Sequence, residues 1–415
     1  MGKGAVLSGG TFKWAVLFVL VFSAALLNFS NMVFASRPVE VMAQFHMDQA
    51  QLTAISSIGV LPGALFSIVL GNYFDRHGAR SIRYVGFVLL LLAAACQIAR
   101  VFAFSYVQLF IITFLSGTFF LPTQVLPAKL IEAWFDRSEM AAANGVYGSG
   151  AGLGITIAFA VGSLFPTTVS ALAFCAGGYV LMALLWAAVA KMPTNAGEAA
   201  PASSDGAPAV SVKAVLKSRN MWFVMICGGL ASGAPLLLNS YMINAFMANG
   251  FPQAYTSVLG VIFNIALVLG AIIPGIIVAK LGRYNAPYFV LCLGGGILIF
   301  LTYVLPAGVL TFILLPLGGF LSASSLSMNF ARIGLLPLTG DFGPESIGIA
   351  GGMNNTAMGV CMFILPTIAA LVFGTNYLAV FVTLLGFFVV MAVVGGVLMP
   401  ELGEKGALAK KARGE

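Results

Sequence analysis

The stretch WAVLFVLVFSAALLNFSNMVFA, residues 14–35, contains no charged side chain. At 1.5 Å per residue, a helix of about 20 mostly apolar residues is long enough to cross the hydrocarbon core of a bilayer. A helix that is apolar on all sides has no face for water. This stretch therefore predicts a membrane-spanning helix.

The rest of the chain repeats this pattern. Of its 415 residues, 60% are hydrophobic and 8% are charged, and the mean hydropathy is +1.02. The apolar runs are continuous rather than alternating, which favours helices over the strands of a barrel. The predicted fold class is an all-α membrane protein with twelve transmembrane helices. We place these helices at 13–35, 51–74, 84–104, 107–131, 140–164, 167–190, 221–248, 255–279, 287–305, 309–336, 346–373 and 377–399.

The distribution of Lys and Arg predicts the orientation of these helices. Of the 20 basic residues, only Arg37 and Arg100 lie away from the connections on one side. Cytoplasmic connections carry the excess of basic residues in membrane proteins. We therefore expect a multi-pass protein of the cell (cytoplasmic) membrane with both termini in the cytoplasm. The same asymmetry accounts for the net charge of +7, so we expect no nucleic-acid partner.

The first apolar run permits a second interpretation, as a cleaved signal peptide. Lys3 and Lys13 precede it, and its end at 33–35 fits the small residues of a cleavage site. Its length exceeds the roughly 7–15 apolar residues of a signal peptide, so we interpret 13–35 as the first span. The five cysteines lie far apart within helical runs and are interpreted as packing residues. We expect no metal and no cofactor.

A polar stretch at 191–218, rich in Ala, Pro, Gly and Ser, is typical of a flexible linker. We predict an N-terminal six-helix bundle over 1–190, a cytoplasmic linker over 191–218, a C-terminal six-helix bundle over 219–400 and a cytoplasmic tail over 401–415. Similar residues about 204 positions apart indicate an internal repeat. The matches are Gly71 with Gly275, Arg76 with Lys280, Gly78 with Gly282 and Gly148 with Gly352. Parallel repeats of six helices are a transporter architecture, with the solute site at their interface.

The string GNYFDRHGAR at 71–80 resembles the signature loop of the major facilitator superfamily. The positions that carry this resemblance are Gly71, Asp75, Arg76, Gly78 and Arg80. With twelve helices and a central linker, the resemblance covers nearly the whole chain. It implies the major facilitator fold, in which two pseudo-symmetric bundles give alternating access to a solute site. The chain departs from the signature at Ala79 and, in the second copy, at Ala279.

The first half is most similar to the cyanate permease and nitroimidazole transporter group. This similarity is carried by Arg37-Pro38, Arg100, LPAKLIEAWF at 126–135 and GVYGSGAGLG at 145–154. KLGRY at 280–284 resembles oxalate–formate antiporters, but the basic residues expected in the eighth and eleventh helices are absent. The second helix also lacks the arginine expected of nitrate porters. Oxalate and nitrate are therefore disfavoured as substrates.

The segment at 71–80 is predicted to be a conformational latch. Gly78 allows a tight reversal, and Asp75 can bind the unpaired N–H groups at the start of the eleventh helix. By resemblance, Asp75 and Arg76 would hold the two halves together and stabilise the outward-open state. Gly71 and Arg80 are the remaining residues of the predicted latch. The alternative is a solvated loop that obeys the positive-inside rule.

Glycine and proline suggest where helices approach closely or bend. Glycines in the fifth and eleventh helices allow close contact, either for sliding or for static packing. Pro122 and Pro127 are predicted to bend the fourth helix.

The resemblance places the solute site on the first, fourth, seventh and tenth helices. Their interior polar residues are Asn28, Asn31, Gln124, Asn239, Tyr241, Ser325 and Asn329. A polar side chain within the membrane must find a partner or line water. Each residue is therefore a candidate solute contact or a hydrogen-bond link between helices.

Basic residues at helix ends are candidate anion contacts. Arg37, Lys129 and Arg332 border the predicted pathway and could bind a carboxylate or a cyanate-like anion. The alternatives are snorkelling to lipid headgroups and, for Lys129, pairing with Glu132. No acidic residue lies deep in a helix, which argues against proton-coupled and drug-extruding carriers.

Together these features predict a secondary transporter of a small solute, with a small anion (cyanate-like or a short carboxylate) as the leading candidate. The alternatives are a facilitator or exporter of small neutral or drug-like compounds, and a membrane sensor or receptor. An enzyme is not expected, because the chain has no catalytic cluster, and the two-fold repeat disfavours a channel. The expected partners are the small-molecule solute and the lipid bilayer, and we expect a monomer.

Overall fold

A computed structural model describes residues 3–135, 137–162, 164–190, 212–343, 346–403 and 405–408. Within these ranges the regular structure is helical and contains no strand. The chain divides into two compact units, each treated by itself below. The first unit comprises Met1–Asp48 and Ile58–Asp205, and the second comprises Gln49–Ser57 and Gly206–Glu415.

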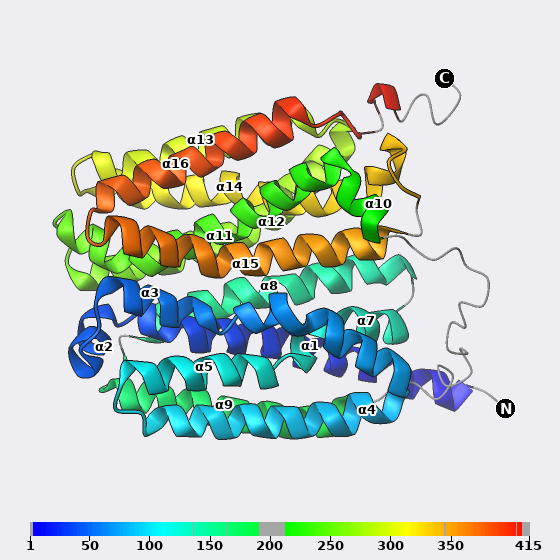
Figure 1. The fold of residues 1–415 in the computed structure, drawn as a ribbon, viewed down its shortest axis with the longest axis horizontal. Helices are drawn as coiled ribbons and strands as arrows, with labels where there is room; N and C mark the ends of the chain where they lie inside the picture. Colours follow the sequence, from blue (N-terminus) through cyan, green and yellow to red (C-terminus); the bar gives the residue numbers. More distant parts are fainter. Residues whose placement is uncertain are drawn as a thin grey trace. The chain divides into compact units, whose positions relative to one another are not determined.

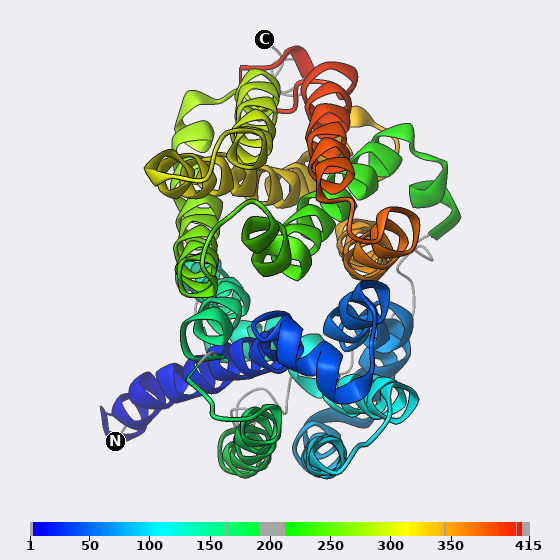
Figure 2. The ribbon, with the colours of Figure 1, turned by 90° about the vertical axis from the view of Figure 1, so that its left-hand side faces the viewer.

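The helices are labelled in Figure 1, and Figure 2 views many of them nearly end on. The first unit contains α1 (Lys3–Ala35), α2 (Pro38–Phe45), α4 (Leu61–Val101), α5 (Tyr106–Phe119), α6 (Pro122–Val125), α7 (Pro127–Trp134), α8 (Arg137–Gly162) and α9 (Thr168–Val189). The second contains α3 (Gln49–Ile58), α10 (Val212–Lys217), α11 (Arg219–Ala248), α12 (Gln253–Leu281), α13 (Asn285–Val304), α14 (Val309–Leu335), η2 (Leu336–Thr339), α15 (Ile347–Phe373), α16 (Tyr377–Val393) and η4 (Val394–Leu398).

The predicted spans all have helical counterparts. In the described ranges, nine helices are long and apolar enough to cross a membrane, and the bent pair of α3 and the start of α4 makes a tenth. Two shorter apolar helices, α5 and part of α8, occupy the two remaining predicted spans. The helix α2 was not predicted. The helix α10 lies within the stretch predicted as linker, of which residues 191–211 fall outside the described ranges.

The predicted loop at 71–80 is helical, because α4 continues through it. However, this helix cannot be straight. An added Cβ at Gly117 would lie 2.3 Å from the carbonyl oxygen of Gly59, and Gln97 donates a hydrogen bond of 2.8 Å to Ser116. Residues 59 and 97 thus lie beside neighbouring residues, although a straight helix would separate them by about 57 Å. The chain therefore reverses within α4, as Figure 1 shows at its right-hand end; the predicted loop conformation was wrong.

Two prolines divide the predicted fourth helix into α5, α6 and α7. Pro122 and Pro127 are the first residues of α6 and α7. A proline is tolerated there, because the first N–H of a helix has no partner within the helix. The predicted bend is confirmed.

Glycines of α8 allow close contact with α1. An added Cβ at Gly150 would lie 2.6 Å from the carbonyl oxygen of Val21, and one at Gly154 would lie 2.0 Å from that of Ala25. No side chain fits between these backbones. In contrast, a Cβ at Gly148 would have no heavy atom within 4 Å. The close contact of helices is therefore confirmed for Gly150 and Gly154, whereas its purpose, sliding or static packing, stays a prediction.

The two units repeat the same helix pairings. In the first unit α1 packs on α8, and α4 packs on α5 and α9; in the second, α11 packs on α15, and α13 packs on α14 and α16. If the six predicted helices of each half are numbered in order, then in both halves the first packs on the fifth, and the third packs on the fourth and the sixth. Each unit also has its own cluster of buried apolar side chains. The pairing supports the internal repeat.

Candidate solute site

Two amide side chains of the first unit lie against the bend of the second span. An added Cβ at Gly59 would lie 2.3 Å from Oδ1 of Asn31, and one at Gly63 would lie 2.5 Å from Oε1 of Gln124. Asn31 belongs to α1 and Gln124 to α6. Gly59 lies in the break between α3 and α4, and Gly63 lies in the first turn of α4. The two amides therefore lie beside the same bend of the chain.

Each of these amides has a donor without a partner. Nδ2 of Asn31 and Nε2 of Gln124 are buried and form no hydrogen bond within the described part of the chain. Leaving a buried donor unsatisfied costs about 1–3 kcal/mol, and buried polar groups normally have partners. The arrangement can therefore bind a molecule that brings its own acceptor atoms.

A buried arginine contacts the residue that precedes Asn31. The guanidinium of Arg100 on α4 is fully buried and donates to both oxygens of Ser30 and to Oε1 of Gln97, over 2.6–3.2 Å. It also lies 4.7 Å from the centre of the Phe34 ring. No carboxylate among the described residues forms an ion pair with it. Since Ser30 precedes Asn31, this charge adds positive potential near the unpaired amide donors.

In the second unit, Asn329 belongs to a buried polar cluster. Its Nδ2 donates to the carbonyl oxygen of Val224 over 3.2 Å and to Oδ1 of Asn354 on α15 over 3.1 Å. A Cβ at Gly228 would clash with both amides. Its Oδ1 has no partner within the ranges that the structure covers. Asn354 was missed; an asparagine within an otherwise apolar, glycine-rich run was the signal that could have found it.

Asn239 links two helices. It exchanges two hydrogen bonds, of 3.2 and 2.8 Å, with Asn264 of α12, and both side chains are buried. Asn264 was not predicted. The interhelical role that the sequence offered as an alternative is therefore confirmed for Asn239.

Four other candidate residues do not belong to the clusters described above. Ser325 donates to the carbonyl oxygen of Ser322, and Asn28 to that of Ala24, each within its own helix. Tyr241 is buried, and its hydroxyl has no partner among the described residues. Lys129 on α7 is half-buried. Their contact with a solute stays a prediction.

Arg332 of α14 lies in the interior of the second unit. Its guanidinium donates to Oδ1 of Asn285 over 3.0 Å and to the carbonyl oxygen of Gly395 over 2.7 Å. It lies 4.3 Å from the centre of the Tyr288 ring. Gly395 belongs to η4, a π-helical turn at the end of α16. Arg332 is fully buried, so the snorkelling alternative is wrong, and its role in anion binding stays a prediction.

Arg37 is the centre of a cluster that joins α1, α8 and α9. Its guanidinium donates to the carbonyl oxygen of Gly162 over 2.8 Å, to that of Phe165 and to the carboxylate of Glu40. Glu40 also accepts hydrogen bonds from N and Oγ1 of Thr168, over 2.6 and 2.9 Å. The cation lies at the end of α8 and the carboxylate at the start of α9, where each complements the helix dipole. This structural role was missed, and solute binding by Arg37 stays a prediction.

Glu40→Gln is expected to lower the melting temperature at pH 7 by about 2 °C, a small effect because solvent screens the partly exposed carboxylate. Burial raises the pKa of Glu40, but hydrogen bonds from Arg37 and Thr168 together lower it further, so its net pKa lies below the usual value. The stabilisation is therefore complete above the unfolded pKa of about 4.3 and is lost as the pH falls through the folded pKa. Melting curves of both proteins should converge in acid. A gap that stays constant with pH would contradict this role.

The predicted latch residues lie on α4. Gly71 packs against Val125, and Arg80 is exposed. The side chains of Asp75, Arg76 and Gly78 lie outside the described residues, so the latch stays a prediction.

The repeated helical bundles, with polar clusters enclosed in apolar helices, are the fold of a secondary transporter. The chain belongs to the Major Facilitator Superfamily, whose family model matches residues 16–366. This confirms the family and the fold class expected from the sequence.

A relative, the probable nitrate/nitrite antiporter NarK1 of Thermus thermophilus, is 24% identical over 286 residues. The match covers 66% of this chain and 59% of that relative, so this chain spans less than two thirds of its length. Among solved structures, the nucleoside transporter NupG is similar with a TM-score of 0.70 and 15% identity, covering 92% of this chain and 97% of NupG. A bacterial homologue of the human lysosomal transporter Spinster has a TM-score of 0.63 and 14% identity, with 94% and 95% covered. At these identities the solved structures show the fold alone.

Proposed function

We propose that this transporter carries a small monovalent anion, with nitrate, nitrite, cyanate and short carboxylates as candidate substrates. The observation that carries the proposal is the pair of unpartnered amide donors, Asn31 Nδ2 and Gln124 Nε2, beside the bend at Gly59 and Gly63. Buried donors favour a solute that supplies acceptor oxygens or nitrogens. Both donors lie beside the same bend of the second span, which favours a compact solute over a large one.

Fixed charge favours an anion over a cation. None of the nine candidate spans in the described ranges contains Asp or Glu. Two buried arginines, Arg100 and Arg332, lie in these spans, and no carboxylate there forms an ion pair with either. Unneutralised positive charge has a long reach in a medium of low dielectric constant. The similarity to NarK1, which is named as a nitrate/nitrite antiporter, also supports an anion. The second span lacks arginine, so binding beside its bend would use neutral donors.

The carrier works by alternating access, with its termini on the cytoplasmic side of the cell membrane. The distribution of basic residues supports this orientation. Asp75 and Arg76 form the latch between the bundles, and the protein acts as a monomer.

Counterflow in proteoliposomes tests the proposal. Purified protein is reconstituted in liposomes loaded with one unlabelled anion, and uptake of labelled nitrate, nitrite, cyanate or formate is followed. We expect saturable uptake of at least one anion, accelerated by the same anion inside. An imposed pH gradient should leave the exchange rate unchanged, because the spans hold no acidic residue to relay protons.

Uridine and a nitroimidazole serve as neutral comparison solutes, and protein-free liposomes as the blank. If only the neutral solutes were exchanged, the proposed anion substrate would be wrong and the protein would be a carrier of small neutral compounds. Anion binding by the purified protein without any counterflow would instead indicate a sensor.

A further inference from the structure

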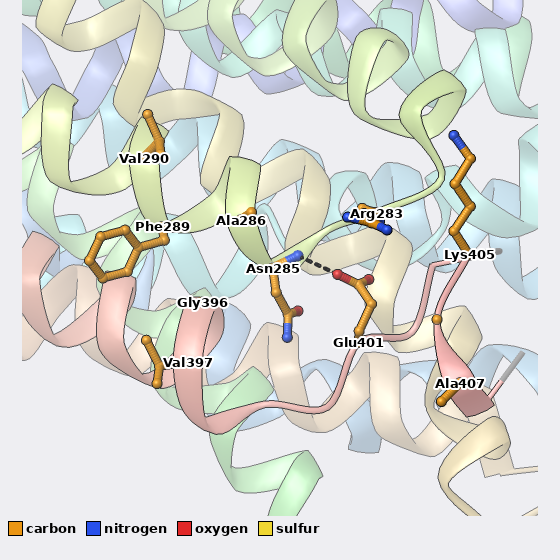
Figure 3. Close-up of a pocket in the computed structure, with 11 residues that line it drawn as sticks. Arg283, Asn285, Ala286, Phe289, Val290, Gly396, Val397, Glu401, Lys405 and Ala407 are labelled. Carbon is orange, nitrogen blue, oxygen red and sulfur yellow. Dashed lines mark hydrogen bonds between the residues drawn. The ribbon is translucent and has the colours of Figure 1, made fainter.

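A pocket at one end of the second unit lies apart from the residues considered above. It has a volume of about 620 Å³ and lies between the start of α13, the end of η4 and the segment that follows. Its lining changes in character from one end to the other. Figure 3 shows Phe289, Val290 and Val397 at the apolar end and Arg283 and Lys405 at the opposite end.

Residues 399–403 and 405–406, which follow η4, are fixed against the connection between α12 and α13. The carboxylate of Glu401 accepts hydrogen bonds of 2.9 Å from the backbone N–H groups of Tyr284 and Asn285. The backbone N–H of Lys405 donates to the carbonyl oxygen of Gly282 over 3.0 Å. These contacts place Lys405 and Arg283 on the rim of the same pocket.

Neither of the two cations at this rim forms an ion pair in the described part of the chain. Both side chains are exposed, and neither forms a hydrogen bond or an ion pair there. Glu401 is the one carboxylate among the lining residues, and its oxygens already bind backbone N–H groups. The cationic end can therefore bind an anionic group from outside the protein.

The apolar end faces away from the protein interior. Val290 is 65% exposed and Val397 is 63% exposed, and both lie in helices long and apolar enough to cross the membrane. Such surfaces contact acyl chains in a bilayer. A ligand that fits both ends has an anionic head and an apolar body.

We propose that this pocket binds an anionic phospholipid, with its phosphate at Arg283 and Lys405 and its acyl chains along Val290 and Val397. The predicted orientation places this end at the cytoplasmic leaflet, where basic pockets between membrane helices bind anionic headgroups. A soluble phosphate would use the cationic end alone and would leave the exposed valines uncovered. The lipid also bridges Lys405 and the start of α13. This site is independent of the identity of the transported solute.

Native mass spectrometry of the full chain in detergent, titrated with phosphatidylglycerol or phosphatidylcholine, tests the site. The double variant Arg283→Gln/Lys405→Gln should bind phosphatidylglycerol roughly 30-fold more weakly, at about 1 kcal/mol per cation. Its phosphatidylcholine binding should not change. A variant that binds phosphatidylglycerol as the unaltered protein does would overturn the proposal.

Three further measurements make the result specific. Lys217→Gln/Arg219→Gln removes two exposed cations from elsewhere in the second unit. This variant should bind phosphatidylglycerol normally. If it lost as much affinity as the pocket variant, net charge rather than the pocket would explain the binding. Val290→Asn/Val397→Asn should also weaken lipid binding, because it removes the apolar end. Glycerol 3-phosphate, which has no acyl chains, should not compete. Full competition by it would replace the lipid with a soluble phosphate.

Discussion

Asn31→Leu is expected to raise the melting temperature of the solute-free protein while it slows anion exchange by about 10- to 150-fold. The side chain is 4% exposed and its Nδ2 has no partner within the described residues. Replacing an unsatisfied buried donor by an apolar group of similar size recovers about 1–3 kcal/mol of stability. The same change removes a hydrogen bond to a charged solute, which is worth about 1.5–3 kcal/mol and corresponds to the stated loss of rate. Melting curves measure the change in stability. Counterflow in proteoliposomes, with an anion that the unaltered protein exchanges, measures the change in rate.

The opposite signs separate a binding residue from a structural one. Where an amide holds helices together, replacement by leucine should destabilise the protein. We expect this for Asn239→Leu, because Oδ1 of Asn264 would then be left without a donor. Asn31→Asp should slow exchange further than the leucine variant, since a carboxylate repels an anion. Asn376→Asp is the matched control, because Asn376 caps α16 through Oδ1 and aspartate caps equally well. Exchange at the normal rate in Asn31→Leu would remove Asn31 from the site.

Gly154→Leu is expected to abolish folding of the first unit. An added Cβ at this position would lie 2.0 Å from the backbone oxygen of Ala25, and a backbone atom cannot move aside as a flexible side chain can. The pairing of α1 with α8 would have to separate along its length. Overpacking in a well-packed interior costs about 1–3 kcal/mol and sometimes more, and the backbone contact places this change at the upper limit. The yield of monodisperse protein and its melting temperature measure the effect.

Gly148→Leu is the matched control on the same helix. A Cβ there would have no heavy atom within 4 Å, so yield and melting temperature should stay normal. If Gly154→Leu were as stable as Gly148→Leu, the close contact of α1 and α8 would not be needed for the fold. Slowed exchange in stable Gly148→Leu protein would support the sliding role predicted from sequence.

Much of the fold was predictable because membrane helices carry a strong signal. Continuous apolar runs predicted each span, and Pro122 and Pro127 marked the breaks of the fourth helix. The reversal of the chain near 71–80 was predicted, but its helical conformation was not, since Gly78 permits a loop without requiring one. The short helix α2 was missed because its eight residues are too few for a spanning pattern.

The candidate site was predictable only as a set of polar positions. Asn31 and Gln124 were found because an amide within an apolar membrane helix must have a hydrogen-bond partner or line water. Which partner each amide meets could not be predicted, since helices that are apolar on all sides carry no pattern of faces. Asn239 therefore had the same signal as Asn31, although one is paired and the other is not. Arg332 lies in the last turn of α14 as predicted, but its burial was not predicted because the sequence does not reveal the π-helical turn that offers it Gly395.

The contact of Arg332 with the π-helical turn η4 bears on how the protein responds to acidity. Backbone carbonyl oxygens, rather than carboxylates, hold both buried guanidinium groups, since Arg332 binds that of Gly395 and Arg100 binds that of Ser30. Peptide oxygens do not take up protons between mild acid and mild alkali, and arginine keeps its proton throughout. The hydrogen bonds that hold these two guanidinium groups therefore persist over a range of acidity that would protonate the aspartate or glutamate of other carriers.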